Sequence, residues 1–344
     1  MNNKKKSFFL KNKTFIIAEV GLAHDGSVGI AKSFIDKISY AGADAVKFQM
    51  HISEEESSKY EKFRKIFSTQ DLTRQDYWKR TSFSFSQWLE IKKYCEKKKI
   101  IFLCSPFSLR SVEILSELNI LAWKIPSGEF NNILLLNKII DLSSKPLILS
   151  TGLSDMNEIK KVVDLLKKRK REFCLLQCTS EYPTKISRVG HNLIKKFKST
   201  FACKAGLSDH SGNINSLLAA VAYDAEIIET HVTFDKFFFG PDTSSSINFN
   251  ELKMLCSFRD DFFLIKNNYL EKSYNSNQKK LRKIFNKSLI VNKNLNKGEK
   301  LKYEDLDSRK PCKGIPAFEY KNYLGKKINV KIKAGNFLKK NFFK

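Results

Sequence analysis

Two histidines each follow a short apolar segment, His210 in GLSDHSG and His231 in ETHVTF. Short apolar segments rich in β-branched residues predict strands, and residues 213 to 225 between the histidines have the apolar spacing of a helix. Parallel strands joined by a helix lie side by side, with their carboxyl ends at the same edge. We therefore expect the two imidazoles to meet and to bind a divalent metal. Because a closed structural zinc site uses more than two protein ligands, substrate or water would complete the coordination.

Two lysines, Lys47 and Lys124, lie within segments that otherwise have the composition of buried strands. A lysine is almost never buried without a partner, so both side chains need an anion or a polar group beside them. Hydroxyl groups occur at the ends of other predicted strands, at Ser105, Ser127, Ser150, Ser180 and Ser208. Because cations and hydroxyl donors make strong hydrogen bonds to phosphate oxygens, we predict that these residues bind a phosphorylated substrate.

Three carboxylates, Glu19, Glu129 and Asp242, lie close to the same predicted strand ends. Carboxylates at such positions transfer protons or bind sugar hydroxyls. A phosphate site, a metal site and carboxylates together indicate an aldol-type or phosphate-releasing reaction on a sugar. The other three histidines, His24, His51 and His191, are expected to be structural or peripheral.

The residues named above must be positioned by an alternation of strands and helices that runs from residue 14 to about residue 265. Eight segments have strand character, and a helical pattern follows each of them. The predicted strands are 14–20, 43–49, 100–106, 122–127, 146–151, 173–179, 203–209 and 225–234. This count and length favour an α/β TIM (β/α)8 barrel over the alternative, a doubly wound open sheet.

Two stretches depart from the alternation. Residues 50 to 83 are polar and too long for an ordinary connection, so we expect them to cross the active-site face. From about residue 285 the chain has short β-like pieces and glycine turns, which predict a small β-rich module. The expected organisation is a barrel domain at 1–272, a polar linker without an apolar period at 273–284, and the small domain at 285–344.

Composition limits the functional classes. The chain has 344 residues and a formal net charge of +26, but its basic residues are spread over most predicted helices, so we predict no nucleic-acid partner. Its 7 cysteines include no CxxC pair, which is typical of a reducing compartment. The start of the chain has too short an apolar core for a signal peptide, and no segment approaches the roughly 20 apolar residues of a membrane span. We expect a cytoplasmic protein without membrane contact.

Nine motifs in order carry a resemblance to a known family. They are AEVGLAHDGS, AGADAVKFQ, SPF, WKIPSGE, LSTG, CTSEYP, GLSDHSG, ETHVTF and GPD. In order and spacing the chain resembles the sialic acid synthase family, which comprises N-acetylneuraminate synthases and their legionaminate and pseudaminate relatives. The segment from Ser288 resembles the antifreeze-like SAF module of that family, a β-clip domain. The resemblance covers nearly the whole chain.

The resemblance implies that phosphoenolpyruvate, water and an N-acyl aminohexose give a nine-carbon 2-keto-3-deoxy sugar acid and phosphate. The sugar would be N-acetylmannosamine or a diacetamido-trideoxyhexose. A divalent metal on His210 and His231, Mn²⁺ with Mg²⁺ or Co²⁺ as alternatives, would polarise the sugar aldehyde. The implied phosphoenolpyruvate site is Lys47, Ser105, Lys124, Ser127, Ser150, Ser180 and Ser208. The implied sugar site is Gln49, Glu129, Tyr182 and Asp242, and the candidate catalytic groups are Glu19, Glu129 and Asp242.

The resemblance also implies a homodimer in which the small module of one subunit completes the partner's active site. In the family this module contributes an arginine to the N-acyl group of the sugar. The sequence here is SRKP, so either Arg309 or Lys310 would take that role, although a lysine lacks the planar fork of arginine. The turn GLAHDG lacks the Asn-His pair of many members, and Glu181 lies beside the expected pocket. These departures leave the identity of the N-acyl sugar open.

Two alternatives remain. Another phosphoenolpyruvate-dependent barrel, making deoxyheptulosonate or deoxyoctulosonate phosphate, would bind a phosphorylated sugar and would need a second cluster of cations, which the sequence does not show. A noncatalytic sugar- or nucleic-acid-binding protein would depend on the charge of +26. Such a protein would not require both histidines and both lysines, and its binding to DNA would weaken with salt.

Overall fold

The computed structural model describes residues 13–58, 60–61, 63 and 70–343. The chain divides into two compact units, Met1–Asn268 and Tyr269–Lys344. The first twelve residues, on which the signal-peptide prediction rests, lie outside the described residues.

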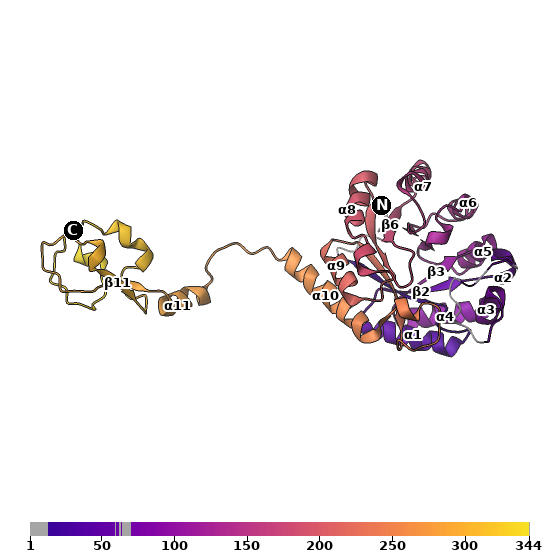
Figure 1. Ribbon diagram of the computed structural model, residues 1–344, viewed down its shortest axis with the longest axis horizontal. Coiled ribbons are helices and arrows are strands. Elements are labelled where there is room, and N and C mark those ends of the chain that lie inside the picture. The colour runs from indigo at the N-terminus through magenta and orange to yellow at the C-terminus, as the bar shows by residue number, and fades with distance from the viewer. Residues whose placement is uncertain (1–12, 59, 62, 64–69, 344) are drawn as a thin grey trace, which may run out of the picture. The chain divides into compact units, whose positions relative to one another are not determined.

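Parallel strands β1 to β8 form a nearly closed barrel in the first unit (Figure 1). Their hydrogen-bonded order is β3-β2-β1-β8-β7-β6-β5-β4, and β3 and β4 lie beside each other. The bounds are β1 Phe15–Gly21, β2 Ala45–Met50, β3 Ile101–Pro106, β4 Trp123–Ile125, β5 Leu147–Ser150, β6 Phe173–Cys178, β7 Lys204–Asp209 and β8 Ile227–Thr233. Each lies on a predicted strand, so the barrel prediction is confirmed.

Helices follow the strands and surround the barrel (Figure 1). They are α1 Val28–Ala41, α4 Phe85–Lys97, α5 Leu109–Glu117, α6 Ile133–Leu142, α7 Met156–Lys168, α8 Asn192–Phe201, α9 Ile214–Ala222 and α10 Phe249–Asn267. Side-chain caps mark several helix starts, because the first amides of a helix have no partner within it. The Ser27 hydroxyl accepts from the amide of Ile30 before α1, and Asp155 and Glu158 form a capping box at α7.

Strand residues alternate between two apolar layers, as the pleat of a strand requires. Ile16 and Phe48 point outward and pack against the helices. Ile17, Leu103 and Ile148 point inward and fill the barrel. The polar groups of the same strands lie at the carboxyl ends, beyond the inner apolar layer.

The stretch predicted to cross the active-site face contains two helices in its described part, α2 Ser53–Glu56 and α3 Arg74–Thr81. Tyr77 and Trp78 of α3 are buried and pack with Leu22, which follows the first strand. Other barrel strands are followed by short 3-10 turns and, after β8, by a two-residue strand. The turns are Ser127–Glu129, Ile186–Arg188 and Thr243–Ser245, and the strand is β9, Ile247–Asn248. Segments outside the regular barrel therefore supply additional walls at this face.

The second unit is a small β-rich body. Strands β10 Ser288–Val291 and β11 Leu306–Arg309 pair antiparallel, and 3-10 turns span Tyr303–Asp305, Ala317–Asn322 and Lys340–Phe342. Its own apolar core includes Leu289, Ile315 and Leu338. The prediction of a linker without a helical period was wrong in this respect, because α11 occupies Ser276–Phe285.

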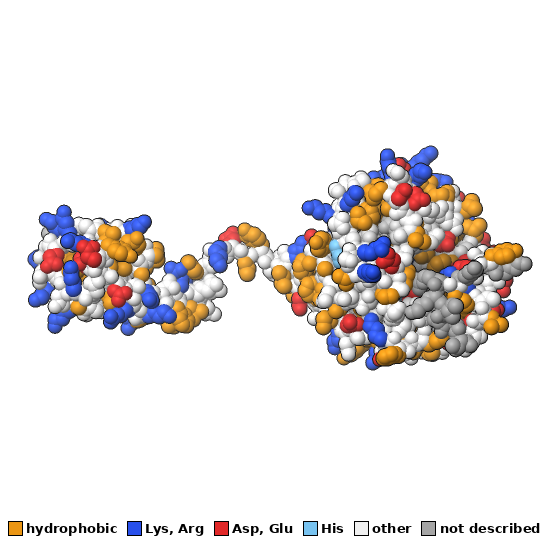
Figure 2. Space-filling model, in the orientation of Figure 1, with side chains coloured by type: hydrophobic (Ala, Val, Ile, Leu, Met, Phe, Trp, Pro, Cys, Tyr) orange, Lys and Arg blue, Asp and Glu red, His pale blue; other side chains and the backbone are white. Residues whose placement is uncertain are grey.

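The surface carries its basic excess in a dispersed form. Figure 2 shows lysine and arginine side chains scattered among acidic and apolar ones on the visible face of each unit. Some of the lysines are paired with carboxylates, such as Lys32 with Glu90 and Lys138 with Glu113. Across the described residues, no helix is both long enough and apolar enough to cross a membrane.

Candidate active site

A buried cluster of polar side chains forms what we call the floor of the site, at the carboxyl ends of β1, β2 and β3. The Lys47 ammonium lies 2.7 Å from Oε2 of Glu19 and donates to the Ser105 hydroxyl at 3.2 Å. Gln49 donates through Nε2 to the other oxygen of Glu19 at 2.8 Å. The strand register produces this arrangement, because Glu19 is aligned with Lys47 on one neighbour and with His231 on the other.

The other half of the floor is built around Lys124 of β4. Its ammonium donates to the Ser150 hydroxyl at 2.8 Å and lies 3.3 Å from Oε1 of Glu229. The Ser208 hydroxyl donates to the same carboxylate oxygen at 3.1 Å. Glu229 was not among the predicted site residues. The sequence held a signal for it, because it precedes His231 by two residues and side chains two apart on a strand share a face.

Burial and charge compete at the two lysines. Burial disfavours the ammonium of Lys47, but Glu19 and Glu229 outweigh that cost and raise its pKa. At Lys124 burial prevails over the attraction of Glu229, and the pKa of Lys124 is lowered. Burial alone would raise the pKa of Glu229, but Lys124 and Lys47 lower it. With both lysines protonated, two cations balance two carboxylates in the floor.

The two predicted metal ligands lie together. The rings of His210 and His231 are 5.4 Å apart between centroids, and Tyr182 lies 4.2 Å from His210. Burial, with a smaller effect of His231, lowers the pKa of His210 to about 3, so its ring is neutral at physiological pH. Neutral imidazole is the form that binds metals.

A metal bound to His210 and His231 would have two protein ligands. The described residues hold no group of three or more His, Cys, Asp and Glu side chains arranged for a metal ion. A side-chain carbon added at Gly21 would lie 3.5 Å from both Glu19 Oε1 and Gln49 Nε2 and 3.7 Å from the ring of His231. Acidic, amide and imidazole groups therefore face one small space that glycine keeps open.

Two of the serines predicted for the phosphorylated substrate, Ser127 and Ser180, lie beside Gly152. The hydroxyl of Ser127 accepts from the Gly152 amide at 3.1 Å and donates to the Cys178 sulfur at 3.4 Å. A side-chain carbon at Gly152 would lie 2.3 Å from the Ser180 hydroxyl and 2.9 Å from that of Ser127. Residue 152 must therefore lack a side chain for the hydroxyl cluster to keep this form.

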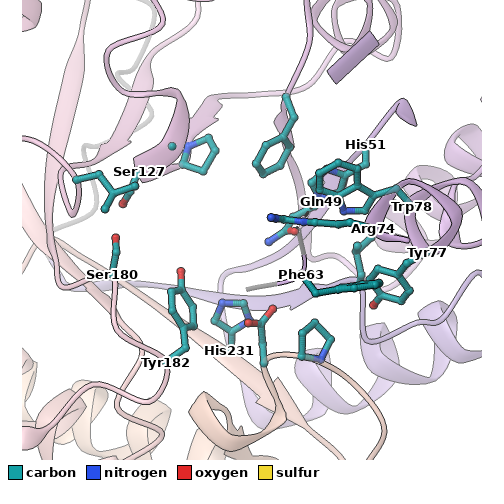
Figure 3. A pocket seen from close by; sticks show the side chains of 17 residues that line it. Gln49, His51, Phe63, Arg74, Tyr77, Trp78, Ser127, Ser180, Tyr182 and His231 are labelled. Atoms are coloured by element: carbon teal, nitrogen blue, oxygen red, sulfur yellow. Dashed lines mark hydrogen bonds between the residues drawn. The ribbon is translucent and has the colours of Figure 1, made fainter. Parts of the chain in front are cut away.

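Above the floor lies a pocket of about 420 Å³. Six predicted site residues line it, namely Gln49, Ser127, Ser180, Tyr182, His231 and Asp242. Figure 3 shows Ser127, Ser180, Tyr182 and His231 on one side and an aromatic wall on the other. Predicted residues that instead lie buried are Glu19, Lys47, Ser105, Lys124, Ser150, Ser208 and His210. The two groups are joined because Gln49 contacts Glu19 and Tyr182 packs on His210.

Sequence reasoning missed most of the aromatic wall, which we define as His51, Arg74, Tyr77, Trp78 and Phe107. His51, expected to be structural or peripheral, is buried and stacked on Trp78 and Phe107, and it also lies in the pocket lining. Figure 3 shows the Arg74 guanidinium extending from α3 into the pocket. A signal existed only for His51, which follows Gln49 by two residues at a strand end and so shares its face.

His24 and His191 behave differently from His51. His24 is fully buried and stacks on Phe83 with ring centroids 4.4 Å apart. His191 is partly exposed and its Nε2 lies 2.8 Å from the carbonyl of Ser216. Neither residue lines the described pocket.

The remaining predicted residues occupy three places. Glu129 ends the 3-10 turn after β4, accepts from Asn132 at 2.7 Å, and has a pKa raised by burial. Arg309 is the last residue of β11 in the second unit, and the Lys310 ammonium lies 5.4 Å from the centre of the Phe285 ring. Glu181 is paired with Arg188 at 2.8 Å.

Comparison with known proteins gives consistent relationships. The model of the NeuB family matches residues 34–264, and that of the SAF domain matches residues 286–344. The chain is 35% identical over 320 residues to N,N'-diacetyllegionaminic acid synthase of Campylobacter jejuni, covering 91% of this chain and 95% of the relative. It is 34% identical to human N-acetylneuraminate-9-phosphate synthase, covering 70% and 68%.

Among solved structures, an N-acetylneuraminic acid synthetase from Leptospira borgpetersenii, crystallised with citrate, is similar with a TM-score of 0.69. It shares 33% sequence identity, and the match covers 78% of this chain and 90% of that one. The family model spans more than half of the chain, and full-length relatives share both units. This chain therefore belongs to the NeuB family of sialic acid-type synthases, with a C-terminal SAF domain.

Proposed function

We propose that this enzyme condenses phosphoenolpyruvate with an unphosphorylated N-acyl aminohexose and water to give a nine-carbon 2-keto-3-deoxy sugar acid and phosphate. The observation that carries the proposal is the floor. Two buried lysines are held in ion pairs with Glu19 and Glu229 beneath a pocket that also exposes His231. Such a site binds an anion at its base and leaves the pocket above it for a neutral sugar.

Phosphoenolpyruvate would bind on the two halves of the floor and the serine cluster. Lys47 and Lys124 supply charge, and Ser105, Ser127, Ser150, Ser180 and Ser208 supply hydroxyl donors. Because the floor lysines are already balanced by carboxylates, a bound anion needs further positive charge. A divalent cation at the adjacent histidines would provide it.

His210 and His231 would hold this cation, with Mn²⁺ as our first choice and Mg²⁺ or Co²⁺ as alternatives. When bound, the metal would act as a Lewis acid on the sugar carbonyl. Two neighbouring residues are proposed to have separate roles. Tyr182 packs on His210 and closes one side of the space, while Glu19 lies where it would orient a water or accept a proton.

Two further carboxylates would share the acid and base roles at the sugar. Glu129 is partly buried with a raised pKa, which suits a group that donates a proton. Asp242 lines the pocket, where it would bind sugar hydroxyls. Gln49 and Tyr182 complete the proposed sugar site from β2 and from the loop after β6.

The acceptor is proposed to be an N-acylated sugar without phosphate. Among the described residues that line the pocket, Arg74 is the one lysine or arginine, and Glu61 already pairs with it at 2.8 Å. A phosphate dianion would be served poorly by one neutralised cation. The aromatic and proline side chains of the lining suit the methyl groups of acetamido and deoxy positions. We therefore favour a diacetamido-trideoxyhexose over N-acetylmannosamine and its phosphate.

The assembly is proposed to be a homodimer in which the SAF domain of one subunit completes the other's pocket. Arg309 or Lys310 would contact the N-acyl group of the sugar, and the alanine variants of each would identify which one acts. The enzyme is proposed to work in the cytoplasm, without nucleic-acid or membrane partners. The free state of all seven cysteines is consistent with a reducing compartment.

The test is phosphate release from phosphoenolpyruvate by the full chain with Mn²⁺. N-acetylmannosamine, its 6-phosphate, diacetamido-trideoxyhexoses and a reaction without sugar are run in parallel. We expect release with a diacetamido-trideoxyhexose, and loss of release after chelation or in His210→Ala. His191→Ala is the matched control and should retain turnover. Release only with the phosphorylated sugar, or none with any sugar by a folded and metal-loaded protein, would overturn the proposal.

A further inference from the structure

A continuous line of hydrogen bonds leads from the aromatic wall to the floor. The imidazole of His51 places Nδ1 2.7 Å and 2.9 Å from the two oxygens of Glu56. Its Nε2 lies 3.1 Å from Oε1 of Gln49, and Nε2 of Gln49 donates to Glu19 at 2.8 Å. Glu19 is in turn paired with Lys47 at 2.7 Å. Five side chains are thus connected in sequence, from β1, β2, α2 and, in the case of His51, the residue directly after β2.

The chemistry of these groups assigns the hydrogens along the line. One oxygen of Glu19 is paired with the Lys47 ammonium, and the other accepts from the NH2 group of Gln49, which therefore points towards it. The amide oxygen of Gln49 then faces His51 and needs a donor there, which places a hydrogen on Nε2 of His51. A neutral His51 with that hydrogen has an acceptor at Nδ1 and therefore requires a donor from Glu56. A protonated Glu56 supplies it.

The surroundings of the pair favour this neutral arrangement. Burial, followed by the nearby charge of Glu61, raises the pKa of Glu56 to about 9, and Arg74 opposes that rise. Burial and then Arg74 lower the pKa of His51 to about 3. Glu129 also faces Glu56 electrostatically. At neutral pH the pair is therefore a carboxylic acid bonded to a neutral imidazole.

Packing fixes the plane of the imidazole. The His51 ring lies between Trp78 and Phe107, with centroid distances of 4.8 Å and 4.1 Å and interplanar angles of 7° and 26°. A ring held on both faces cannot turn its nitrogens away from Gln49 and Glu56. Gln49 is thus held at both ends of its amide, and its second N–H remains for the pocket.

We propose that His51 and Glu56 are positioning residues that lock the Gln49 amide so that it presents an N–H, and not a carbonyl, to an oxygen of the sugar. This inference rests on the proposed assignment of Gln49 to the sugar site. Loss of the lock lets the amide rotate and present its oxygen to the substrate. The acceptor sugar must consequently place a carbonyl or hydroxyl oxygen, acting as hydrogen-bond acceptor, against Gln49.

Steady-state kinetics of the full chain with varied sugar and varied phosphoenolpyruvate test the lock. His51→Phe keeps the ring stack but removes both nitrogens, and we expect kcat/KM for the sugar to fall about tenfold with KM for phosphoenolpyruvate unchanged. In Gln49→Ala we expect kcat/KM for the sugar to fall by at least the same factor. Glu56→Gln, whose NH2 donates to Nδ1 as a carboxylic acid does, should stay within about twofold of wild type at pH 7.

The pH profile separates positioning from a purely structural role. When Glu56 ionises, with a pKa of about 9, it releases its proton to solvent and its carboxylate can only accept a hydrogen bond. The single hydrogen of neutral His51 then moves from Nε2 to Nδ1 to donate to Glu56, and a lone pair at Nε2 faces the Gln49 oxygen. Sugar kcat/KM in wild type should therefore decline at alkaline pH. The Glu56→Gln enzyme cannot ionise there and should lack this part of the decline. Identical alkaline profiles in the two enzymes contradict the proposal.

The outcomes for the lock and for the sugar site are distinguishable. A loss in Gln49→Ala without a loss in His51→Phe overturns the lock and leaves the sugar assignment intact. Unchanged sugar kinetics in Gln49→Ala remove the sugar assignment itself. A Glu56→Gln enzyme as impaired at pH 7 as Glu56→Ala also contradicts the proposal, because it would show that a carboxylate is needed.

Discussion

The floor and the aromatic wall of the pocket are built in different ways. Floor residues such as Lys47, Lys124 and Glu229 stand on barrel strands, and each makes a hydrogen bond to a residue of a neighbouring strand. The wall is carried mainly by the segment between β2 and α4, where Arg74 and Trp78 belong to the short helix α3. The floor is charged and buried, whereas the wall is largely aromatic, and two of its residues, Arg74 and Phe107, are partly exposed.

This difference separates chemistry from selectivity. Groups that handle phosphate and metal need fixed positions, which the register of a barrel supplies. Groups that recognise the variable end of a sugar are carried by a segment that can change without disturbing the barrel. Substitutions in the floor should therefore affect reaction with every sugar equally, whereas substitutions in the wall should change the preference among sugars.

The largest effect is expected for Lys124→Met. Removal of this ammonium leaves Glu229 buried with Ser208 as its remaining close partner, and it removes a cation from the phosphoenolpyruvate site. We expect kcat/KM for phosphoenolpyruvate to fall by about 10²-fold or more, by the same factor for every sugar. Stability of the barrel should fall by about 3 to 5 kcal/mol, measured by chemical unfolding.

Lys138→Met is the matched control for Lys124→Met. Lys138 pairs with Glu113 at the surface, where an ion pair contributes about 1 kcal/mol or less. Its kinetics should match wild type. If Lys124→Met lost activity with one sugar but retained it with another, the proposed difference between floor and wall would be contradicted.

A smaller effect is expected for Gly152→Ala. The added methyl group would lie 2.3 Å from the Ser180 hydroxyl and 2.8 Å from the Cys178 sulfur, so these groups must move. We expect a cost of about 1 to 3 kcal/mol in stability, with a raised KM for phosphoenolpyruvate. Gly128→Ala controls for the substitution, because a side-chain carbon there meets no heavy atom within 4 Å. Equal losses of stability in the two variants would refute the crowding argument.

The smallest effect is expected for Arg74→Ala in the wall. The guanidinium lies over Trp78 at 4.6 Å, pairs with Glu61 and extends into the pocket. We expect KM for the preferred sugar to rise by about three- to tenfold, with KM for phosphoenolpyruvate unchanged and a smaller effect on poorer sugars. Lys79→Ala, an exposed position of the same helix, should behave as wild type. If the KM for every sugar rose by the same factor, Arg74 would behave as a floor residue and not as a wall residue.

Sequence alone located the floor because strand periodicity fixes which side chains reach the carboxyl ends of a barrel. Lys47, Lys124 and His231 follow from that rule, and Glu229 follows from it as well, although its role became visible only through its contacts. The wall could not be found in this way. The position of Trp78 depends on how α3 packs against Leu22, which local patterns do not contain.

The predicted linker shows the opposite failure. Leu281, Ile284 and Phe285 have the spacing of one helical face, but lysines around them give the segment a polar average. An N-cap at Asn275, whose side chain accepts from the amide of Gln278, starts helix α11 there. A capping pattern can thus reveal a short helix whose apolar content is too low to attract notice.

Among the described residues, β3 and β4 are the two neighbouring barrel strands that are not joined by a ladder of backbone hydrogen bonds. We call this gap in the hydrogen bonding the seam of the barrel. Ser105 stands on one side of it and Lys124 on the other. Backbone amides along a seam open more readily than those in a continuous ladder, and so exchange their hydrogens faster. A phosphate bound by residues on both strands would link β3 to β4 and make their backbone hydrogen bonds open less often. Deuterium uptake at β3 and β4 would then report occupancy of the site without any turnover.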